Sequence, residues 1–227
     1  MELIRLTDGA DPRYARARAL YKRSFPFHEQ REERSQLNIL GAPEYQYLLI
    51  YDGDLWVGLM LCWETETFIY VEHFCTFPEL RGQGYGRRAL EVLGRRGKTV
   101  ILEIDPPADP VSIRRKGFYE RCGYVANPFP HVHPPYHRGV KGHDLVVMSC
   151  PKALGPREYE EFALVERWYG KLKNQLALKP AVFLSLIPPY YGHHLTDDLG
   201  LIAINGLIGG VFRQEQRVAV LAPQGLY

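Results

Sequence analysis

The chain has 227 residues, of which 46% are hydrophobic and 24% are charged, and its formal net charge at pH 7 is +2. These values are typical of a folded domain and exclude wholesale disorder, and the near-neutral charge gives no electrostatic reason to expect nucleic-acid binding. The four cysteines are scattered without a Cys-x-x-Cys pair. This pattern favours reduced thiols in a cytoplasmic protein over a disulfide framework or a thiolate zinc site.

The sequence gives no sign of a membrane segment. The first residues are charged from Glu2 onward and lack the continuous apolar stretch of a secretory signal. The most apolar region, residues 180–212, is interrupted by prolines, glycines and histidines, and its second half is shorter than the ~20 residues that a spanning helix needs. We therefore expect no membrane anchor.

The first half of the chain predicts an opening strand, two helices and three strands. The expected ranges are 3–6 for the opening strand, 12–24 and 28–40 for the helices, and 45–51, 55–64 and 67–76 for the strands. The three later strands are rich in β-branched, aromatic and aliphatic residues. Asp52-Gly53-Asp54 is a strong tight-turn pattern, so the first two of them are expected to form a hairpin.

The second half alternates helices with strands. The expected helices are 84–95, a helix beginning at Pro110 and a helix over 156–178, and the expected strands are 100–104, 124–127 and 144–149. Asp109 is predicted to cap the helix that begins at Pro110, and Gly123 to end it in the left-handed conformation. This order of elements predicts an α/β (α+β) protein with a mixed sheet.

A glycine-rich segment, Arg81-Gly82-Gln83-Gly84-Tyr85-Gly86, lies between a predicted strand and a predicted helix. Glycines allow close approach to the backbone, and the first N–H groups of a helix point outward at its positive end, which suits a pyrophosphate. Alone, the pattern is equally compatible with a plain turn. It is not a P-loop, because no Lys-Ser or Lys-Thr follows, and it does not match the dinucleotide-binding glycine spacing.

A second motif, Gly117-Phe118-Tyr119-Glu120-Arg121-Cys122-Gly123-Tyr124, ends the next predicted helix. By itself it indicates an aromatic helix face closed by glycine. Together, the two spaced motifs resemble the GNAT superfamily of acyl-CoA-dependent N-acetyltransferases, of the bacterial type. The resemblance is specific over residues 67–124 and extends, by element order, over residues 1–165. It implies the GNAT fold, with a mixed central sheet of six to seven strands and about four helices. Residues 166–227 then form a C-terminal extension of unknown structure, helical at its start.

The resemblance implies that acetyl-CoA is the acyl donor and assigns its contacts. The pyrophosphate would be held by the glycine-rich segment and the next residue, namely Arg81, Gly82, Gln83, Gly84, Tyr85, Gly86 and Arg87. The pantetheine arm would pair with the backbone of Phe74, Cys75 and Thr76. Ser112 stands where the family often has an asparagine that contacts the cofactor, and it would bond more weakly. A bound phosphate would also explain why Arg87 and Arg88 lie in the first helical turn, where the dipole disfavours cations.

The same resemblance assigns the general acid to Tyr119, which would protonate the departing thiolate. The acceptor amine must lose a proton before it can attack. Glu72 is the first choice of base, and strand alternation places the neighbouring His73 on the opposite face. Glu103 and Asp105, expected on one face, are the other carboxylate choices, and transfer through a water chain stays open.

Four histidines, His131, His133, His137 and His143, fall in one proline-rich loop. We expect them either to line the acceptor site together with Phe129 and Tyr136 or to be ordinary loop residues, and we expect no metal. The leading hypothesis is acetyl transfer to a primary amine of a small molecule or peptide. A non-catalytic acyl-CoA-binding regulatory module is the alternative, and an ATP-binding protein is a more distant one. The acceptor cannot be read from the sequence, and a homodimer is left open.

Overall fold

The computed structural model describes residues 1–137 and 139–167. The chain divides into two compact units, residues 1–178 and 179–227, and every described residue belongs to the first. The strand-like segments noted in the sequence at residues 181–187 and 217–221 lie outside the described residues, as does the second half of the helix expected over 156–178.

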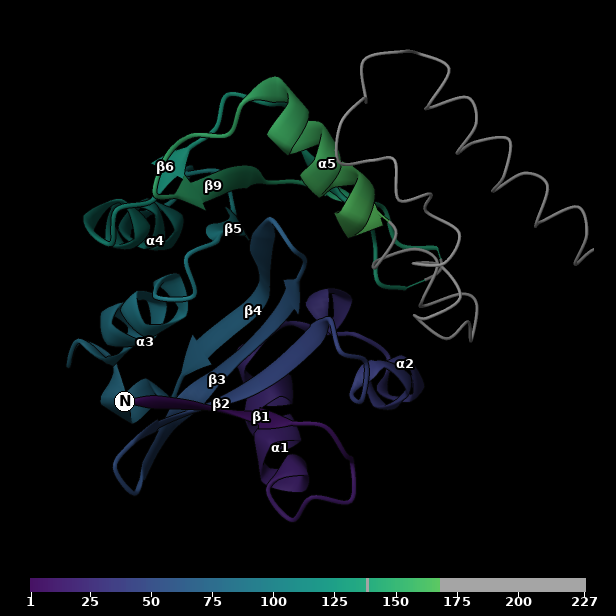
Figure 1. Ribbon diagram of the computed structural model, residues 1–227. Helices are drawn as coiled ribbons and strands as arrows, with labels where there is room; N and C mark the ends of the chain where they lie inside the picture. The colour runs from purple at the N-terminus through teal and green to yellow at the C-terminus, as the bar shows by residue number, and fades with distance from the viewer. Residues whose placement is uncertain (138, 168–227) are drawn as a thin grey trace, which may run out of the picture. The chain divides into compact units, whose positions relative to one another are not determined.

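The described part of the chain forms its main strands and α-helices in the order that the sequence predicts (Figure 1). The strands are β1 (Glu2–Leu6), β2 (Tyr45–Asp52), β3 (Leu55–Glu64), β4 (Phe68–Thr76), β5 (Thr99–Ile104), β6 (Val125–Ala126), β7 (Val132–His133), β8 (His143–Asp144) and β9 (Val146–Cys150). The helices are α1 (Tyr14–Ser24), α2 (Glu33–Ile39), α3 (Tyr85–Gly94), α4 (Pro110–Arg121) and α5 (Pro156–Arg167), and the 3-10 turns are η1 (Phe27–Glu29) and η2 (Pro78–Leu80). The two 3-10 turns and the short strands β7 and β8, in the region expected to be a loop, are additional.

One expected helix is wrong in its extent. The sequence predicts a helix over residues 28–40, but the structure has η1 followed by the short helix α2, with extended backbone at Gln30 and Glu32 between them. The break has a physical cause, because the side chain of Arg31 turns into the protein and forms an ion pair with Glu72 of β4. Helical periodicity does not reveal an inward ion pair of this kind.

Seven strands form one mixed sheet in the order β1-β2-β3-β4-β5-β9-β6, and β7 and β8 form a separate two-stranded ribbon. The pairings within the large sheet are antiparallel except for β4 with β5, which is parallel. The expected mixed sheet of six to seven strands is therefore confirmed, and the described part has five helices around it.

The pairing of β4 with β5 stops before either strand ends. Register pairs run from Phe68–Thr99 to Val71–Leu102, whereas β4 continues to Thr76 and β5 to Ile104. Beyond the last pair, residues 72–76 of β4 and 103–104 of β5 are not paired with each other. We call this opening the β4–β5 fork. It leaves backbone groups on the facing edge of each strand without a sheet partner.

The two faces of the sheet are covered by different helices. On one face, residues of α1, α2 and α5 pack with sheet residues such as Trp63 and Tyr70 in a single buried cluster. On the other face, α3 and α4 pack with residues such as Ile69 and Met148. The helices α3 and α4 lie next to each other in Figure 1, so the glycine-rich segment before α3 and the aromatic motif at the end of α4 are on the same side of the sheet.

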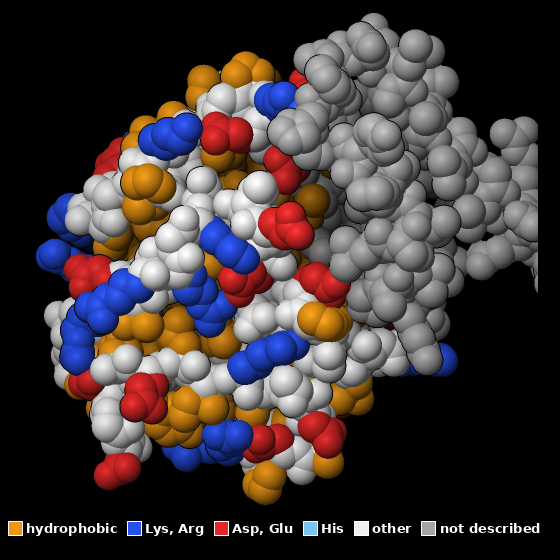
Figure 2. Space-filling view, in the orientation of Figure 1, with side chains coloured by type: hydrophobic (Ala, Val, Ile, Leu, Met, Phe, Trp, Pro, Cys, Tyr) orange, Lys and Arg blue, Asp and Glu red, His pale blue; other side chains and the backbone are white. Residues whose placement is uncertain are grey.

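The distribution of surface charge and the state of the cysteines match what the near-neutral net charge and the scattered cysteines predict. Basic and acidic side chains are intermixed over the face of the described part that Figure 2 shows. All four cysteines are free thiols. Within residues 1–137 and 139–167, no helix combines the length and the apolar character needed to cross a bilayer.

Candidate active site

The glycine-rich segment, residues 81–86, forms a turn that exposes the N-terminus of α3. Gly82 and Gly84 have φ angles of +77° and +81°, a conformation that favours glycine. The N–H of Arg88 bonds to the carbonyl of Gly84, so the N–H groups of the preceding helical residues lie outside the helical ladder. No side chain caps this end, and the first turn contains no acidic residue. The turn therefore presents main-chain donors and a positive dipole end to an anion.

The N-terminus of α4 is different, because its own side chains satisfy it. Asp109 accepts hydrogen bonds from the N–H groups of Val111 and Ser112, as the sequence predicts, and the Ser112 hydroxyl completes a capping box. That hydroxyl bonds to the carboxylate of Asp109 at 2.7 Å, and Ser112 is buried. Ser112 was expected to contact the cofactor, but its hydroxyl is committed to the cap, so we do not include it in the proposed cofactor site.

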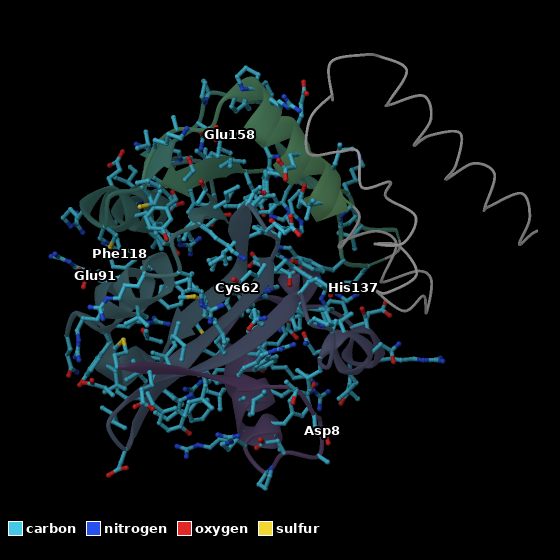
Figure 3. All side chains as sticks on the ribbon, in the orientation of Figure 1. Asp8, Cys62, Glu91, Phe118, His137 and Glu158 are labelled. Atoms are coloured by element: carbon cyan, nitrogen blue, oxygen red, sulfur yellow. The ribbon has the colours of Figure 1, made fainter. Side chains whose placement is uncertain are left out.

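The arginines of the first turn of α3 have carboxylate partners on the protein surface. Arg87 Nε lies 2.8 Å from Glu91 Oε1, and Figure 3 labels Glu91 on the same side of the molecule as Phe118. Arg88 makes two hydrogen bonds to Asp52, at 2.6 and 2.9 Å. These pairs account for both cations without a phosphate. Arg81 is exposed beside the two glycines.

The edge of β4 that borders the fork carries the residues expected to meet the pantetheine arm. The N–H of Phe77 bonds to the carbonyl of Val57 in β3 at 3.0 Å. Since backbone groups alternate in direction along a strand, those of Cys75 face β3, and those of Phe74 and Thr76 face the fork. The Cys75 side chain is buried, and burial raises the pKa of its thiol. Phe74 and Thr76 are thus better placed than Cys75 for main-chain pairing.

Gly86 is the point where the glycine turn, the fork and α4 meet. A side-chain carbon added to Gly86 would lie 3.3 Å from Phe118 Cζ and 3.6 Å from Phe74 Cζ. Phe118 is on α4 and Phe74 is on β4. An alanine at this position would touch Phe74 and would require the ring of Phe118 to shift by a few tenths of an ångström, so the glycine allows α3 to pack closely against both rings.

Tyr119 follows Phe118 on α4 and is buried against the sheet face that α3 and α4 cover. Its ring packs against the rings of Phe118 and Tyr124, at centroid distances of 5.1 and 5.7 Å. Burial raises the pKa of Tyr119 to about 12, so its hydroxyl is protonated at neutral pH. A protonated phenol can donate a proton to a leaving group.

A β-bulge brings Glu72 and His73 to the same side of the sheet. Leu61 pairs with His73 and Cys62 pairs with Val71, so Glu72 is an extra residue in β4. Glu72 Oε2 and His73 Nδ1 lie 3.8 Å apart, and His73 Nε2 contacts the Tyr21 hydroxyl on α1. The expectation that alternation separates the two side chains is wrong, because a bulge interrupts the alternation.

The carboxylate of Glu72 is buried and paired. It accepts a hydrogen bond from Arg31 and another, at 3.1 Å, from the hydroxyl of Tyr136. The Arg31 guanidinium also lies 5.6 Å from the rings of Trp63 and Tyr136. Burial alone would raise the pKa of Glu72, but Arg31 and then His73 outweigh it and hold this pKa well below its usual range. Arg31, which the sequence analysis did not single out, is therefore central to this region.

Glu103 and Asp105 do not share a face. Glu103 points to the α5 side, where it accepts hydrogen bonds from the Tyr70 hydroxyl and from His131. Asp105 lies beyond the end of β5, is half exposed and pairs with Arg115 of α4. The strand ends between them at Ile104, which is why alternation fails. Burial opposes ionisation of Glu103, but His133 and His131 lower its pKa.

The loop histidines separate into two groups. His131 and His133 are buried and face Glu103. His137 stacks on Phe27 at 4.3 Å, on the α2 side of the molecule (Figure 3). His143 lies between the two groups, with its ring 6.1 Å from that of His28 and 5.8 Å from that of His133. The loop therefore does not present all four histidines to one site.

Glu166 is a further buried carboxylate of this region that the sequence analysis missed. Its Oε1 lies 3.7 Å from His131 Nε2 and 3.8 Å from His133 Nε2. The i, i+4 spacing from the buried Phe162 is the pattern that could have revealed it. A domain boundary after residue 165 was expected, and α5 continues through that position.

Comparison with known proteins agrees with this geometry. The Acetyltransferase (GNAT) family matches residues 14–124, which include the β4–β5 fork, the glycine turn and Tyr119. The chain carries a GNAT acetyltransferase domain. A search of curated proteins gives no significant match. Among solved structures, a chain from Bacteroides thetaiotaomicron assigned to the GNAT family is 28% identical with a TM-score of 0.71, and the match covers 76% of this chain and 100% of that one.

Two less similar solved structures contain ligands. A Bacillus subtilis acetyltransferase in complex with CoA is 15% identical, with a TM-score of 0.43 over 65% of this chain and 95% of that one. Arabidopsis thaliana Naa50, in complex with a bisubstrate analogue of CoA and an acetylated peptide, is 18% identical, with a TM-score of 0.47 over 65% and 96%. The match to the Bacteroides chain, with its TM-score of 0.71, is the one that we use to compare folds. It confirms the expected GNAT architecture.

Proposed function

We propose that this GNAT domain transfers the acetyl group of acetyl-CoA to a primary amine by direct attack of the amine. The observation that carries the proposal is the uncapped N-terminus of α3 beside the β4–β5 fork, with the protonated Tyr119 on the helix that packs against the same glycine turn. The family match supports acetyl transfer, and the nature of the acceptor as a primary amine is our inference.

The proposed cofactor site uses mainly backbone groups. The first N–H groups of α3, from Tyr85 to Arg87, hold the pyrophosphate, with Arg81 as the nearby cation that has no carboxylate partner among the described residues. The edge groups of Phe74 and Thr76 pair with the pantetheine arm in place of a β5 neighbour. Acetyl-CoA supplies an acyl group activated as a thioester.

Each protein group then has one task in the reaction. A main-chain N–H at the fork edge of β4 stabilises the oxyanion that forms when the amine attacks the carbonyl carbon. The Tyr119 hydroxyl donates its proton to the sulfur as the carbon–sulfur bond breaks. The nitrogen that has attacked carries one further proton, which passes through water to the Tyr119 oxygen as the amide forms. The products are an amide and a free thiol, Tyr119 is protonated again, and the only net proton released is the one that the ammonium form of the acceptor loses before the attack.

The acceptor proton goes to water in this proposal. Glu72 is bonded to Arg31, Glu103 to His131 and Asp105 to Arg115. The pKa values of Glu72 and Glu103 are lowered by their cationic neighbours, and such a carboxylate is a poor base near neutral pH. Asp105 lies beyond the end of β5, where it is engaged by Arg115 of α4. We therefore favour the water chain over all three carboxylates, and we give Glu72 the role of anchoring Arg31 and Tyr136 beside the fork.

A Tyr119→Phe variant tests the assignment. Release of free thiol from acetyl-CoA is measured over a panel of primary amines, and acetyl-CoA affinity is measured by calorimetry. We expect kcat to fall about 100-fold or more, with the affinity unchanged within about twofold. Tyr124→Phe, which alters the neighbouring buried ring, is the matched control and should keep most of the activity.

Two results would count against the proposal. Equal losses of kcat in the two phenylalanine variants would remove the acid role from Tyr119. If acetyl-CoA binds but no amine causes thiol release, the result would support the alternative hypothesis, a non-catalytic acyl-CoA-binding module. Absence of binding to both CoA and acetyl-CoA would refute the cofactor site itself.

A further inference from the structure

Three side chains that could hold a metal ion, those of Glu103, His131 and Glu166, converge on the face of the sheet that α5 covers, and His133 lies beside the two carboxylates. Glu103 comes from β5, His131 and His133 from the β7 segment, and Glu166 from α5. The side chains of all four are at most 7% exposed. One ligand atom from each of Glu103, His131 and Glu166 lies within 4.8 Å of the others. We call these four residues the His–Glu cluster.

The strand geometry explains how two imidazoles reach one point. His131 and His133 are two residues apart, and the exposed Val132 between them points the other way. The carbonyl of His131 accepts a hydrogen bond from Leu145 N–H, and His133 pairs with His143 of β8, which fixes the segment. A His-x-His pattern on a strand therefore directs both rings to the same side, toward Glu103.

The distances between the histidine nitrogens and the carboxylate oxygens are close to those between ligand atoms that share one metal ion. Ligand atoms about 2.1 Å from a tetrahedral zinc ion lie about 3.4 Å from one another. His131 Nε2 is 3.7 Å from Glu166 Oε1, and His133 Nε2 is 3.8 Å from both Glu103 Oε2 and Glu166 Oε1. The His131–Glu103 contact is a direct hydrogen bond, which an ion would replace by a small movement of either side chain.

The hydrogen bonds around the cluster orient the His131 ring for a metal ion. The Tyr159 hydroxyl donates its single proton to the carbonyl of Pro130, at 2.9 Å. In the contact of this hydroxyl with His131 Nδ1, at 3.1 Å, the ring N–H must therefore be the donor. His131 Nε2 also donates, to Glu103, so a metal ion at Nε2 would displace that proton and leave the ring neutral. On the other side, the Tyr70 hydroxyl donates to Glu103. Outer hydrogen bonds of this kind orient the ligands of metal sites.

His133 is the residue that a simple ion-pair network does not explain. It is 5% exposed, and its Nδ1 has no hydrogen-bond partner among the described residues. Its Nε2 is 3.8 Å from each carboxylate, which is beyond hydrogen-bond distance. A buried imidazole without hydrogen bonds is costly. A coordinate bond from Nε2 to an ion between the carboxylates would satisfy it.

We propose that the His–Glu cluster binds one divalent transition-metal ion, with zinc as the class of ion that suits it best. Two neutral imidazoles and two carboxylates form a closed set of four ligands that balances the charge of a dication. Imidazole ligands favour zinc and its transition-metal neighbours over Mg²⁺ and Ca²⁺, which prefer oxygen. The ion ties together β5, the β7 segment and α5, and so holds the loop that carries Tyr136 against Glu72.

The test measures zinc binding to the full-length chain after removal of metals with a chelator. Zinc is titrated in competition with a chromophoric chelator, and Co²⁺ is added separately to obtain the visible spectrum of a four-coordinate site. We expect one equivalent of zinc per chain and a rise in Tm of about 5 °C or more at saturating zinc. Mg²⁺ and Ca²⁺ should give no rise.

Variants show whether the ion binds in the cluster. His133→Gln and Glu103→Gln should weaken zinc binding about 100-fold or more and abolish the Co²⁺ spectrum. His137→Gln and Glu161→Gln, which replace the same residue types outside the cluster, should leave both unchanged. The double change His193→Gln/His194→Gln controls for the adjacent histidines that lie outside the described residues.

Three outcomes would overturn the proposal. They are no zinc binding by the parent chain, equal binding by the parent chain and by His133→Gln, and loss of binding only in the His193/His194 variant. Should Glu103→Gln fail to fold, His133→Gln decides the question, because its side chain makes no hydrogen bond that the change would break. The Tm without metal reports folding in each case.

Discussion

The guanidinium of Arg31 donates a hydrogen bond to the carboxylate of Glu72, 41 positions away, and both side chains are buried. The pair joins the segment between η1 and α2 to the bulge of β4, next to the β4–β5 fork. It also explains why the predicted second helix is broken. A buried pair of this kind is costly to disrupt, because removal of one partner leaves the other charge without compensation.

Replacement of Arg31 by methionine should therefore be strongly destabilising. We expect the free energy of unfolding to fall by about 3–5 kcal/mol in urea denaturation. The matched control is Arg18→Met, which removes the partly exposed ion pair with Glu33 and should cost about 1 kcal/mol or less. If the free energy of unfolding falls by a similar amount in the two variants, the buried ion pair of Arg31 contributes no more to stability than the partly exposed pair of Arg18.

The lowered pKa of Glu72 makes a prediction about acid stability. The folded protein binds this proton less readily than the unfolded chain does, so the contribution of Glu72 is complete above the unfolded pKa of about 4.3 and declines as the pH falls toward the folded value. In Glu72→Gln, the slope of unfolding free energy against pH should be smaller by up to about 1.4 kcal/mol per pH unit between pH 3 and 4. An unchanged slope, measured beside the surface control Glu91→Gln, would contradict the assignment.

The raised pKa of Tyr119 makes a prediction about alkaline activity. Because this pKa is about 12, the proton needed by the leaving thiolate is retained through the range in which a primary amine of pKa about 10 becomes neutral. We expect kcat/KM to rise with pH and to reach a plateau near pH 10, with no decline below about pH 11 in a protein that stays folded. A decline centred near pH 8 or 9 that is absent in Tyr119→Phe would show that Tyr119 ionises far more easily than its burial implies.

The glycine turn can be tested with a pair of glycines of the same conformation. Gly84 at the start of α3 and Gly97 after its end have φ angles of +81° and +74°, and neither has a neighbouring atom within 4 Å of an added side-chain carbon. Each change to alanine should cost about 1 kcal/mol of stability. Only Gly84→Ala should weaken CoA binding in calorimetry, by about tenfold or more. Equal affinities would mean that the N-terminus of α3 does not hold the pyrophosphate.

Much of the fold could be predicted from the sequence because local patterns decide it. The hairpin around Gly53, the capping of α4 by Asp109 and its end at Gly123 each depend on residues close in the chain. The order of the strands and helices follows from hydrophobic periodicity. The match of two spaced motifs then placed the glycine turn and Tyr119 on the correct elements.

The errors concern relationships that no local pattern records. Glu72 is one extra residue in β4. The side chains that follow it therefore point to the opposite face of the sheet from the one that simple alternation predicts. Arg31 and Glu166 become important only through partners 30 or more positions distant. The side-chain partners of a buried charge are set by tertiary packing, which periodicity cannot supply.

Four residue pairs join β4 to β5, and this seam connects the β1–β4 half of the sheet to the half formed by β5, β9 and β6. Because this seam has fewer residue pairs than the antiparallel pairings of β2 with β3 and β3 with β4 beside it, we expect it to open more readily than they do. A molecule bound in the β4–β5 fork would hold both strands and oppose this opening. The carbonyl of Phe68 faces Thr65 and that of Val147 faces β6, so by alternation the backbone groups of Val71 and Ile101 face the seam. We therefore expect the amide protons of Val71 and Ile101 to exchange more slowly with deuterated solvent when CoA is present.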